Sequence, residues 1–172
     1  ISIHMKEYKQ LLFEELSKPI VWGSIPLLLL SFSRYFTEGF LKVMVLHAAL
    51  YLIFMLNTFY ISKKSQNFAR INLILIFFLI GIGAIFNTQK IIAGVPDFII
   101  AMVLTSLWFE YKYAVINFCI IVISEVLISY FYLGKIEYVH ILSGTAFTLI
   151  TLKAVSVVIK ALEKSKEEEI KS

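Results

Sequence analysis

The sequence predicts an all-α integral membrane protein: a six-transmembrane-helix bundle with an amphipathic interfacial helix before it and a cytoplasmic helical extension after it. Six apolar stretches, each close to the ~20 residues that cross a hydrocarbon core of ~30 Å, favour this class. The composition agrees, since 59% of the residues are hydrophobic, only 16% are charged and the mean hydropathy is +0.84. The predicted spans, which together make up a transmembrane domain over residues 19–161, are Pro19–Phe36, Phe40–Ile61, Arg70–Asn87, Ile91–Phe109, Tyr113–Leu133 and Tyr138–Ala161.

The segment before the first span divides into two parts. Ile1–His4 is expected to be an expression scar and is left out of the fold. Residues 5–18 contain apolar side chains at helical spacing opposite a charged face, a pattern typical of a short helix lying on a membrane surface. They are Tyr8, Leu11, Leu12 and Leu16. A simple anchor leading into the first span fits the same pattern. No cleavable signal peptide is expected, because acidic residues interrupt the basic region and no small-residue cleavage site follows.

Basic residues are unevenly distributed between alternate loops. Eleven of the sixteen Lys and Arg residues lie in the two ends of the chain and in the second and fourth loops. The first, third and fifth loops, on the other side of the membrane, have only Arg34, Lys90 and Lys135 in or beside them. Because short loops rich in Lys and Arg stay in the cytoplasm, both termini are predicted to be cytoplasmic.

The remaining composition excludes several kinds of chemistry. Cys119 is the single cysteine and lies inside an apolar run, so this chain alone offers no disulfide and no cysteine-based metal site. The histidines have no companion at ligand spacing, and neither a metal nor another cofactor is expected. The net charge of +4 indicates no nucleic-acid partner, since the basic residues flank the spans. No catalytic motif lies within the spans, so no catalytic residue and no enzyme activity are predicted for this region.

The last span continues into a charged tail without a Gly or Pro that would end its helix. Residues 162–172 are mostly good helix formers, so we expect the helix to continue past the membrane as a cytoplasmic linker. Across the end of the last span and the start of this linker, four apolar residues recur at the a and d spacing of a coiled coil. They are Leu152, Val155, Ile159 and Leu162. This pattern begins a two-stranded seam and predicts a homodimer through the helix, although Lys166 and Glu169 occupy the next seam positions.

Three further segments complete a recognisable layout: a basic second loop (Ser62–Arg70), an aromatic fourth loop (Leu107–Tyr113) and the charged tail (Ala161–Glu169). With six spans and an amphipathic start, this layout resembles the multi-span sensory region of bacterial signalling proteins. The resemblance covers nearly the whole chain and assigns no role to any single residue. It implies a receptor module of the prokaryotic cytoplasmic membrane. Its last span would relay a signal to a cytoplasmic output domain, such as a histidine kinase of a two-component system or a diguanylate cyclase.

Polar residues inside the predicted spans indicate where a small molecule or a membrane-linked stimulus would act, because polar groups in lipid are costly and tend to be functional. By the predicted topology, five such side chains gather in the outer half of the bundle and form a candidate ligand-binding layer. They are Arg34, His47, Asn87, Asp97 and His140. Structural interpretations stay open: His47 as a hydrogen-bonded packing residue, and Asp97, which follows Pro96, as an acid in the first turn of a helix.

Glu125 lies near the middle of the fifth span among apolar neighbours, where an unpaired carboxylate is costly. Lys153 in the sixth span is predicted to lie within about 6 Å of the same depth, a gap that a lysine side chain covers. The two are therefore predicted to form a buried ion pair, which serves either as a switch or only to fix the register of the helices.

A small-molecule transporter, or the substrate-binding membrane subunit of an importer, is the alternative function for a chain of this size. Such proteins usually have helices broken by Gly or Pro near the midplane of the membrane. Here Gly81, Gly83, Gly94 and Pro96 cluster around the hairpin between the third and fourth spans. That placement favours the sensory interpretation, with the lipid bilayer, a second copy of the chain and a small-molecule ligand as its partners.

Overall fold

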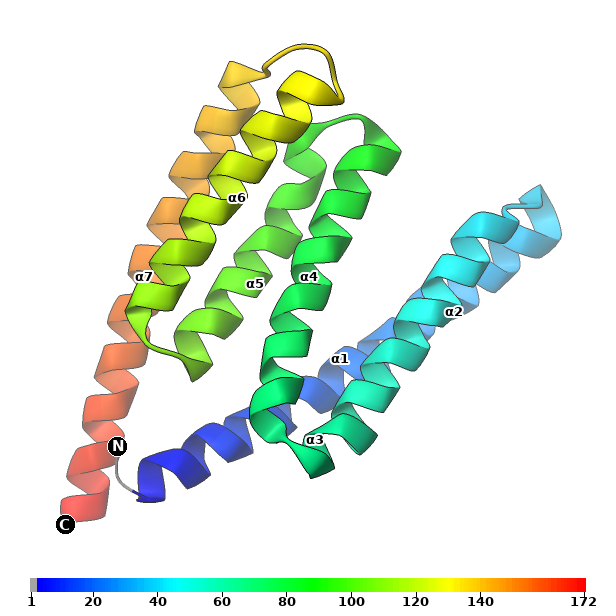
Figure 1. Cartoon of the computed structure of the whole chain (residues 1–172). Coiled ribbons are helices and arrows are strands. Elements are labelled where there is room, and N and C mark those ends of the chain that lie inside the picture. Colours follow the sequence, from blue (N-terminus) through cyan, green and yellow to red (C-terminus); the bar gives the residue numbers. More distant parts are fainter. Residues whose placement is uncertain (1–2) are drawn as a thin grey trace. The chain divides into compact units, whose positions relative to one another are not determined.

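The computed structural model of the chain describes the backbone of residues 3–172 and the side chains of residues 7–172. These residues form helices joined by short turns, with no strand among them (Figure 1). The α-helices are α1 (Ile3–Glu38), α2 (Leu41–Leu56), α3 (Ser62–Lys64), α4 (Gln66–Thr88), α5 (Val95–Trp108), α6 (Tyr111–Phe131) and α7 (Tyr138–Lys171). A π-helical turn, η1 (Asn57–Ile61), joins α2 to α3, and a 3₁₀ turn, η2 (Ile91–Gly94), leads into α5. Residues 1 and 2 of the expected expression scar lie outside the described residues.

Within residues 3–172, six helical stretches are long and apolar enough to cross a membrane. They are Glu7–Glu38, Leu41–Lys64, Gln66–Thr88, Ile91–Trp108, Tyr111–Phe131 and Tyr138–Lys171. The all-α fold with six such helices, predicted from the sequence, is confirmed, and each predicted span falls largely inside one of them.

The segment predicted to lie on the membrane surface is the first part of a longer helix. Residues 5–18 and the first predicted span together form α1, a continuous helix of 36 residues that contains two prolines. A proline inside a helix removes one backbone hydrogen bond and strains the preceding turn. Phe13, Ser17 and Val21 are buried and lie at four-residue spacing, so one packed stripe continues on both sides of Pro19. Packing of that stripe accounts for the helix continuing through the proline.

The chain folds as two compact units, Ile1–Leu73 and Ile74–Ser172. In the first unit, α1 and α2 pack side by side. The turn between them contains Gly39, whose φ of +74° is a conformation that glycine adopts without strain.

A buried asparagine bonds the π-helical turn of the first unit to the beginning of α4. Asn57, at the start of η1, donates from Nδ2 to the carbonyl oxygen of Ala69 at 2.9 Å, and its Oδ1 accepts from Asn72 Nδ2 at 3.4 Å. Both partners belong to α4. These bonds satisfy a polar side chain that would otherwise be costly to bury.

In the second unit, α5 packs against both α6 and α7, and the three helices run side by side (Figure 1). Of the six stretches, the one containing α5 is the most deeply buried. The core of this unit is made of Ile85, Ile91, Phe98, Met102, Ala114, Ile121, Ile141 and Leu152.

Glycines allow two close approaches in the second unit. A Cβ on Gly94 would lie 2.7 Å from the carbonyl oxygen of Gly81, so the backbones of α4 and η2 nearly touch. A Cβ on Gly144 would lie 3.0 Å from Cγ2 of Val95, which brings α7 close to the start of α5. Small residues at helix crossings permit this tight packing.

The last helix extends well beyond its apolar part, as predicted. α7 is one helix of 34 residues, from Tyr138 to Lys171. Its buried residues end at Ser156, and the charged segment after Ala161 is half-buried or exposed.

Candidate functional site

The candidate ligand-binding residues fall into both units. Arg34 and His47 belong to the first unit, whereas Asn87, Asp97 and His140 belong to the second. Within the first unit, no hydrogen bond joins Arg34 to His47, and within the second unit, none joins Asn87, Asp97 and His140 to one another. Neither unit by itself therefore contains a hydrogen-bonded site made of these residues.

His47 has a structural role in the first unit. Its Nδ1 is hydrogen-bonded to Oγ of the buried Ser31, and this bond joins α2 to α1. The Ser31 hydroxyl also donates to the carbonyl oxygen of Leu27 at 2.9 Å. His47 thus serves as a hydrogen-bonded packing residue.

Arg34 and Asp97 also have local partners or positions that account for them. Arg34 forms an exposed ion pair with Glu38 at 3.3 Å and lies 4.7 Å from the centre of the Phe40 ring. Asp97 is half-buried in the first turn of α5, where the helix dipole favours an acidic residue. Asn87 and His140 are exposed.

The predicted dimer seam conflicts with the packing of α7. Leu152 is only 2% exposed and belongs to the core of the second unit. It cannot face a second copy of the chain without leaving that core. Val155 and Ile159 are half-buried and Leu162 is exposed, so the four residues do not form one free stripe. The reason is that the inward face of α7 includes Leu152 together with Thr148 and Ser156.

Glu125 is the most unusual polar residue of the second unit. Its side chain is 2% exposed, and Oε2 has no hydrogen-bond partner. Among the described side chains, no other Asp, Glu, Lys, Arg or His is buried. The position follows from helical spacing, because Ile121, Glu125 and Ser129 lie four residues apart on the inward stripe of α6. A carboxylate buried without a partner is costly, so this position is a candidate site.

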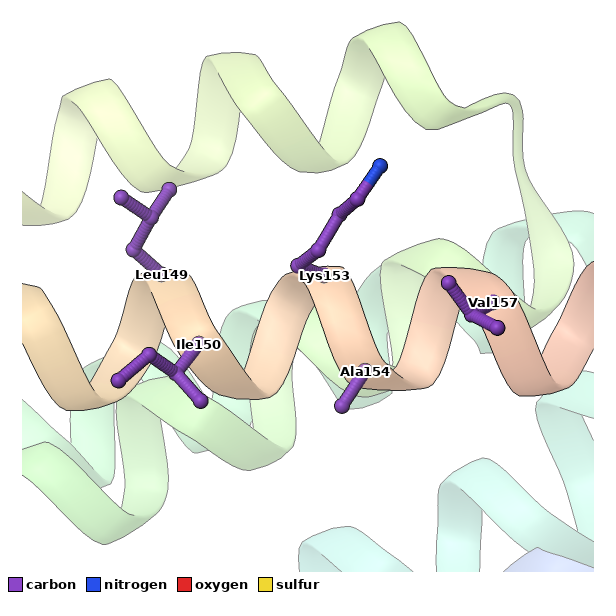
Figure 2. Close-up of a pocket in the computed structure, with 5 residues that line it drawn as sticks. All are labelled: Leu149, Ile150, Lys153, Ala154 and Val157. Atoms are coloured by element: carbon purple, nitrogen blue, oxygen red, sulfur yellow. The ribbon is translucent and has the colours of Figure 1, made fainter.

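The ion pair predicted between Glu125 and Lys153 is not formed among the described residues. Glu125 lies about six residues from the end of α6 at Phe131, whereas Lys153 lies about fifteen residues from the start of α7 at Tyr138. The difference of about nine residues corresponds to ~13.5 Å along the antiparallel hairpin. Lys153 is also exposed, and its side chain rises from α7 on the side of the yellow-green helix in Figure 2. The predicted depth was wrong because the predicted inner ends of the two spans are not level. Counted from the hairpin, Tyr113 lies about 18 residues from the end of α6, whereas Ala161 lies about 23 residues from the start of α7.

A second unsatisfied group lies at the level of Glu125. Thr145 is about seven residues from the start of α7, so both residues are ~9–10 Å from the hairpin turn. The Oγ1 atom of Thr145 is buried and also has no hydrogen-bond partner. Nearby, Ser129 Oγ donates to the carbonyl oxygen of Lys135 at 2.8 Å and accepts from the backbone N–H of Glu137 at 3.0 Å. We call Glu125, Ser129 and Thr145 the α6–α7 polar layer.

The chemistry of this layer is that of a small polar site in apolar surroundings. A free carboxyl oxygen and a free hydroxyl can accept a proton, a water molecule or a hydrogen-bonding cationic group. Sequence reasoning missed Ser129 and Thr145. The signal for Ser129 was its four-residue spacing from Glu125, and the signal for Thr145 was its place beside Gly144 in a small-residue segment.

A separate hydrogen bond joins α6 to α5 nearer the opposite end. Asn117 Nδ2 donates to Thr105 Oγ1 at 2.7 Å, and Thr105 in turn donates to the carbonyl oxygen of Ala101 at 2.8 Å. The Thr105 hydroxyl thus both accepts and donates a hydrogen bond. These hydrogen bonds are therefore best explained as an interhelical contact that stabilises the packing of α6 on α5, rather than as a binding site.

Comparison of the chain with protein families, with curated proteins and with solved structures found no match in any of the three.

Proposed function

We propose that the chain is a membrane sensory module in which the α6–α7 polar layer receives the stimulus and α7 relays it. One observation carries this proposal: α7 is a single helix that contains Thr145, with its buried and unpartnered hydroxyl, near its start and ends in a charged segment. A change in packing at Thr145 is therefore connected to Lys171 by unbroken helical backbone. Because a helix is stiff over this length, a rotation or shift at one end moves the other.

Charging of Glu125 is the proposed event. The buried carboxyl group is tolerated while neutral, and either loss of its proton or arrival of a cationic group would require a new partner. The surrounding residues of α6 and α7 would then repack to supply one. A stimulus of this kind acts by favouring one of two arrangements of the helices, and its effect is limited by its preference for that arrangement. The small-molecule ligand and the output domain belong to this proposal as well.

A reporter fused in register tests the relay. An output domain whose activity depends on helix phase would be joined after Ser172 in the full chain, with one to four alanines inserted after Ala161. We expect output to vary with the ~3.6-residue period of a helix. We also expect Glu125→Gln to fix the output at one level, whereas the exposed Glu110→Gln leaves it responsive. Output that is the same for every insertion would contradict the relay.

A transporter is the second candidate, and the π-helical turn η1 favours it. This turn lies inside the apolar stretch Leu41–Lys64, and such interruptions recur at functional sites and in transporters. Proteoliposomes distinguish the two functions. A transporter would show proton or solute flux that depends on Glu125, whereas a sensory module would show none.

A further inference from the structure

Several lysines lie on one edge of α7, toward the C-terminal end of the helix that contains the charged segment. Lys153, Lys160 and Lys164 lie seven and four residues apart, which places them on one face of the helix, and all three are exposed. Lys160 reaches α6, since its Nζ lies 5.8 Å from the centre of the Tyr111 ring. The exposed Lys112 follows Tyr111 directly and also forms an exposed ion pair with Glu110 at 3.2 Å. Basic residues from both helices therefore gather at this edge.

An open apolar groove of about 590 Å³ adjoins these lysines. It is lined by Leu149, Ile150, Lys153, Ala154 and Val157 (Figure 2). Four of these five residues are apolar, and the side chain of Lys153 extends outward from among them. Within residues 7–172, Lys153 forms no ion pair, so its charge is available to a partner outside the chain.

The depth of Lys153 suits the boundary between hydrocarbon and headgroups. It lies about fifteen residues from Tyr138, or ~22 Å along α7, which leaves ~8 Å of a 30 Å hydrocarbon core. A lysine at that depth extends its ammonium group toward the interface. Lys160 is two turns further along and lies at the headgroup level, where Tyr111 is also typical.

We propose that this edge binds an anionic phospholipid. One acyl chain lies along the groove between Leu149 and Val157, and the phosphate lies between Lys153 and Lys160, with Lys112 on the α6 side. Clusters of Lys beside a transmembrane helix attract anionic headgroups, and a neutral lipid would leave the charges of Lys153 and Lys160 without a carboxylate or phosphate partner. A second copy of the chain fits poorly, because a symmetric contact would bring the same lysines face to face. This inference does not depend on the proposed function, since it uses neither Glu125 nor the relay.

Lipid retention by the purified full chain tests the proposal. The protein is reconstituted in vesicles of phosphatidylcholine and phosphatidylglycerol and extracted in a mild detergent. Native mass spectrometry then gives the mass of the protein with the lipids that it retains. We expect one phosphatidylglycerol per chain to be retained in preference to phosphatidylcholine. Lys153→Gln with Lys160→Gln should reduce that preference by roughly tenfold or more. Lys90→Gln with Lys135→Gln removes the same charge from exposed loop positions and should leave the preference unchanged.

A second variant separates the acyl chain from the phosphate. Ala154→Trp fills the groove and keeps every lysine, so retention of the lipid should fall although the charge is intact. Glycerol phosphate, which carries the headgroup chemistry without acyl chains, should compete weakly for the wild-type chain. Equal retention of both lipids, equal loss in the two lysine pairs, or full competition by glycerol phosphate would overturn the proposal. So would dimers in place of lipid adducts.

Discussion

Glu125 and Lys153 lie on the neighbouring helices α6 and α7 but are separated by about nine residues of helix, or ~13.5 Å. Glu125 faces the core of the second unit, and Lys153 lies on an exposed edge. The two charges therefore have different surroundings and different partners. Their separation leads directly to the first prediction.

Glu125→Gln and Lys153→Gln should have additive effects on thermal stability. Residues that share no partner and lie this far apart usually add to within about 0.5 kcal/mol. The double variant is compared with the two single variants by thermal unfolding of the purified protein. A coupling of roughly 3–5 kcal/mol would instead reveal a buried ion pair.

Gly94→Ala should destabilise the second unit by roughly 1–3 kcal/mol, because the new Cβ would lie 2.7 Å from the Gly81 carbonyl oxygen and 2.9 Å from Ile85. Gly83→Ala is the matched control. Nothing lies within 4 Å of its Cβ position in α4, so it should be neutral or stabilise the helix by up to about 1 kcal/mol. Thermal unfolding measures both, and equal shifts would show that the close approach of α4 to η2 is not formed.

Asn57→Ala should destabilise the first unit around η1. It removes the bond to the carbonyl oxygen of Ala69 and the contact with Asn72, which are worth roughly 0.6–2 kcal/mol in a membrane protein. The exposed Asn67→Ala removes an amide of the same kind from α4 and should have little effect. Faster hydrogen exchange at η1 in the first variant alone is the expected result. Equal hydrogen exchange in the two variants would show that Asn57 does not stabilise η1.

The spacing of apolar residues predicted the helices well because hydrophobic length is a direct physical requirement for crossing a membrane. At Pro19 it left two alternatives open, a surface helix or an anchor leading into the first span, and the buried stripe through Phe13 and Val21 continues the helix. It failed at Leu152, because an apolar stripe on one helix does not say whether it faces its own bundle or a second chain. Packing partners, rather than local preference, decided both cases.

The candidate site was predictable only in part. Glu125 was identified because a carboxyl group stands out in an apolar run. Its lack of a partner depends on the level at which α6 and α7 meet, because Lys153 lies about nine residues further from the hairpin than Glu125 and is out of reach. The layer of Arg34, His47, Asn87, Asp97 and His140 relied on equal depth alone. Depth does not determine which way each side chain points.

The predicted topology places both termini in the cytoplasm. In a Cys119→Ser background, Gln89→Cys in the turn after α4 should react with an impermeant thiol reagent added to intact cells, whereas Ser65→Cys between α3 and α4 should not. Both positions are exposed, so accessibility within the fold does not separate them. Labelling at 65 and not at 89 would reverse the orientation.

The central claim is that the charge of Glu125 sets the arrangement of α7, and a distance measurement tests it most directly. Spin labels at Tyr113→Cys and Leu162→Cys, in a Cys119→Ser background, report the distance between the start of α6 and the extension of α7 as the pH is raised. We expect the wild-type distribution to shift from one population to another and Glu125→Gln to keep the low-pH population throughout. The same titration in Asp97→Asn and His140→Gln should shift as in the wild type. A distribution that does not change with pH, or that changes equally in Glu125→Gln, would contradict the account.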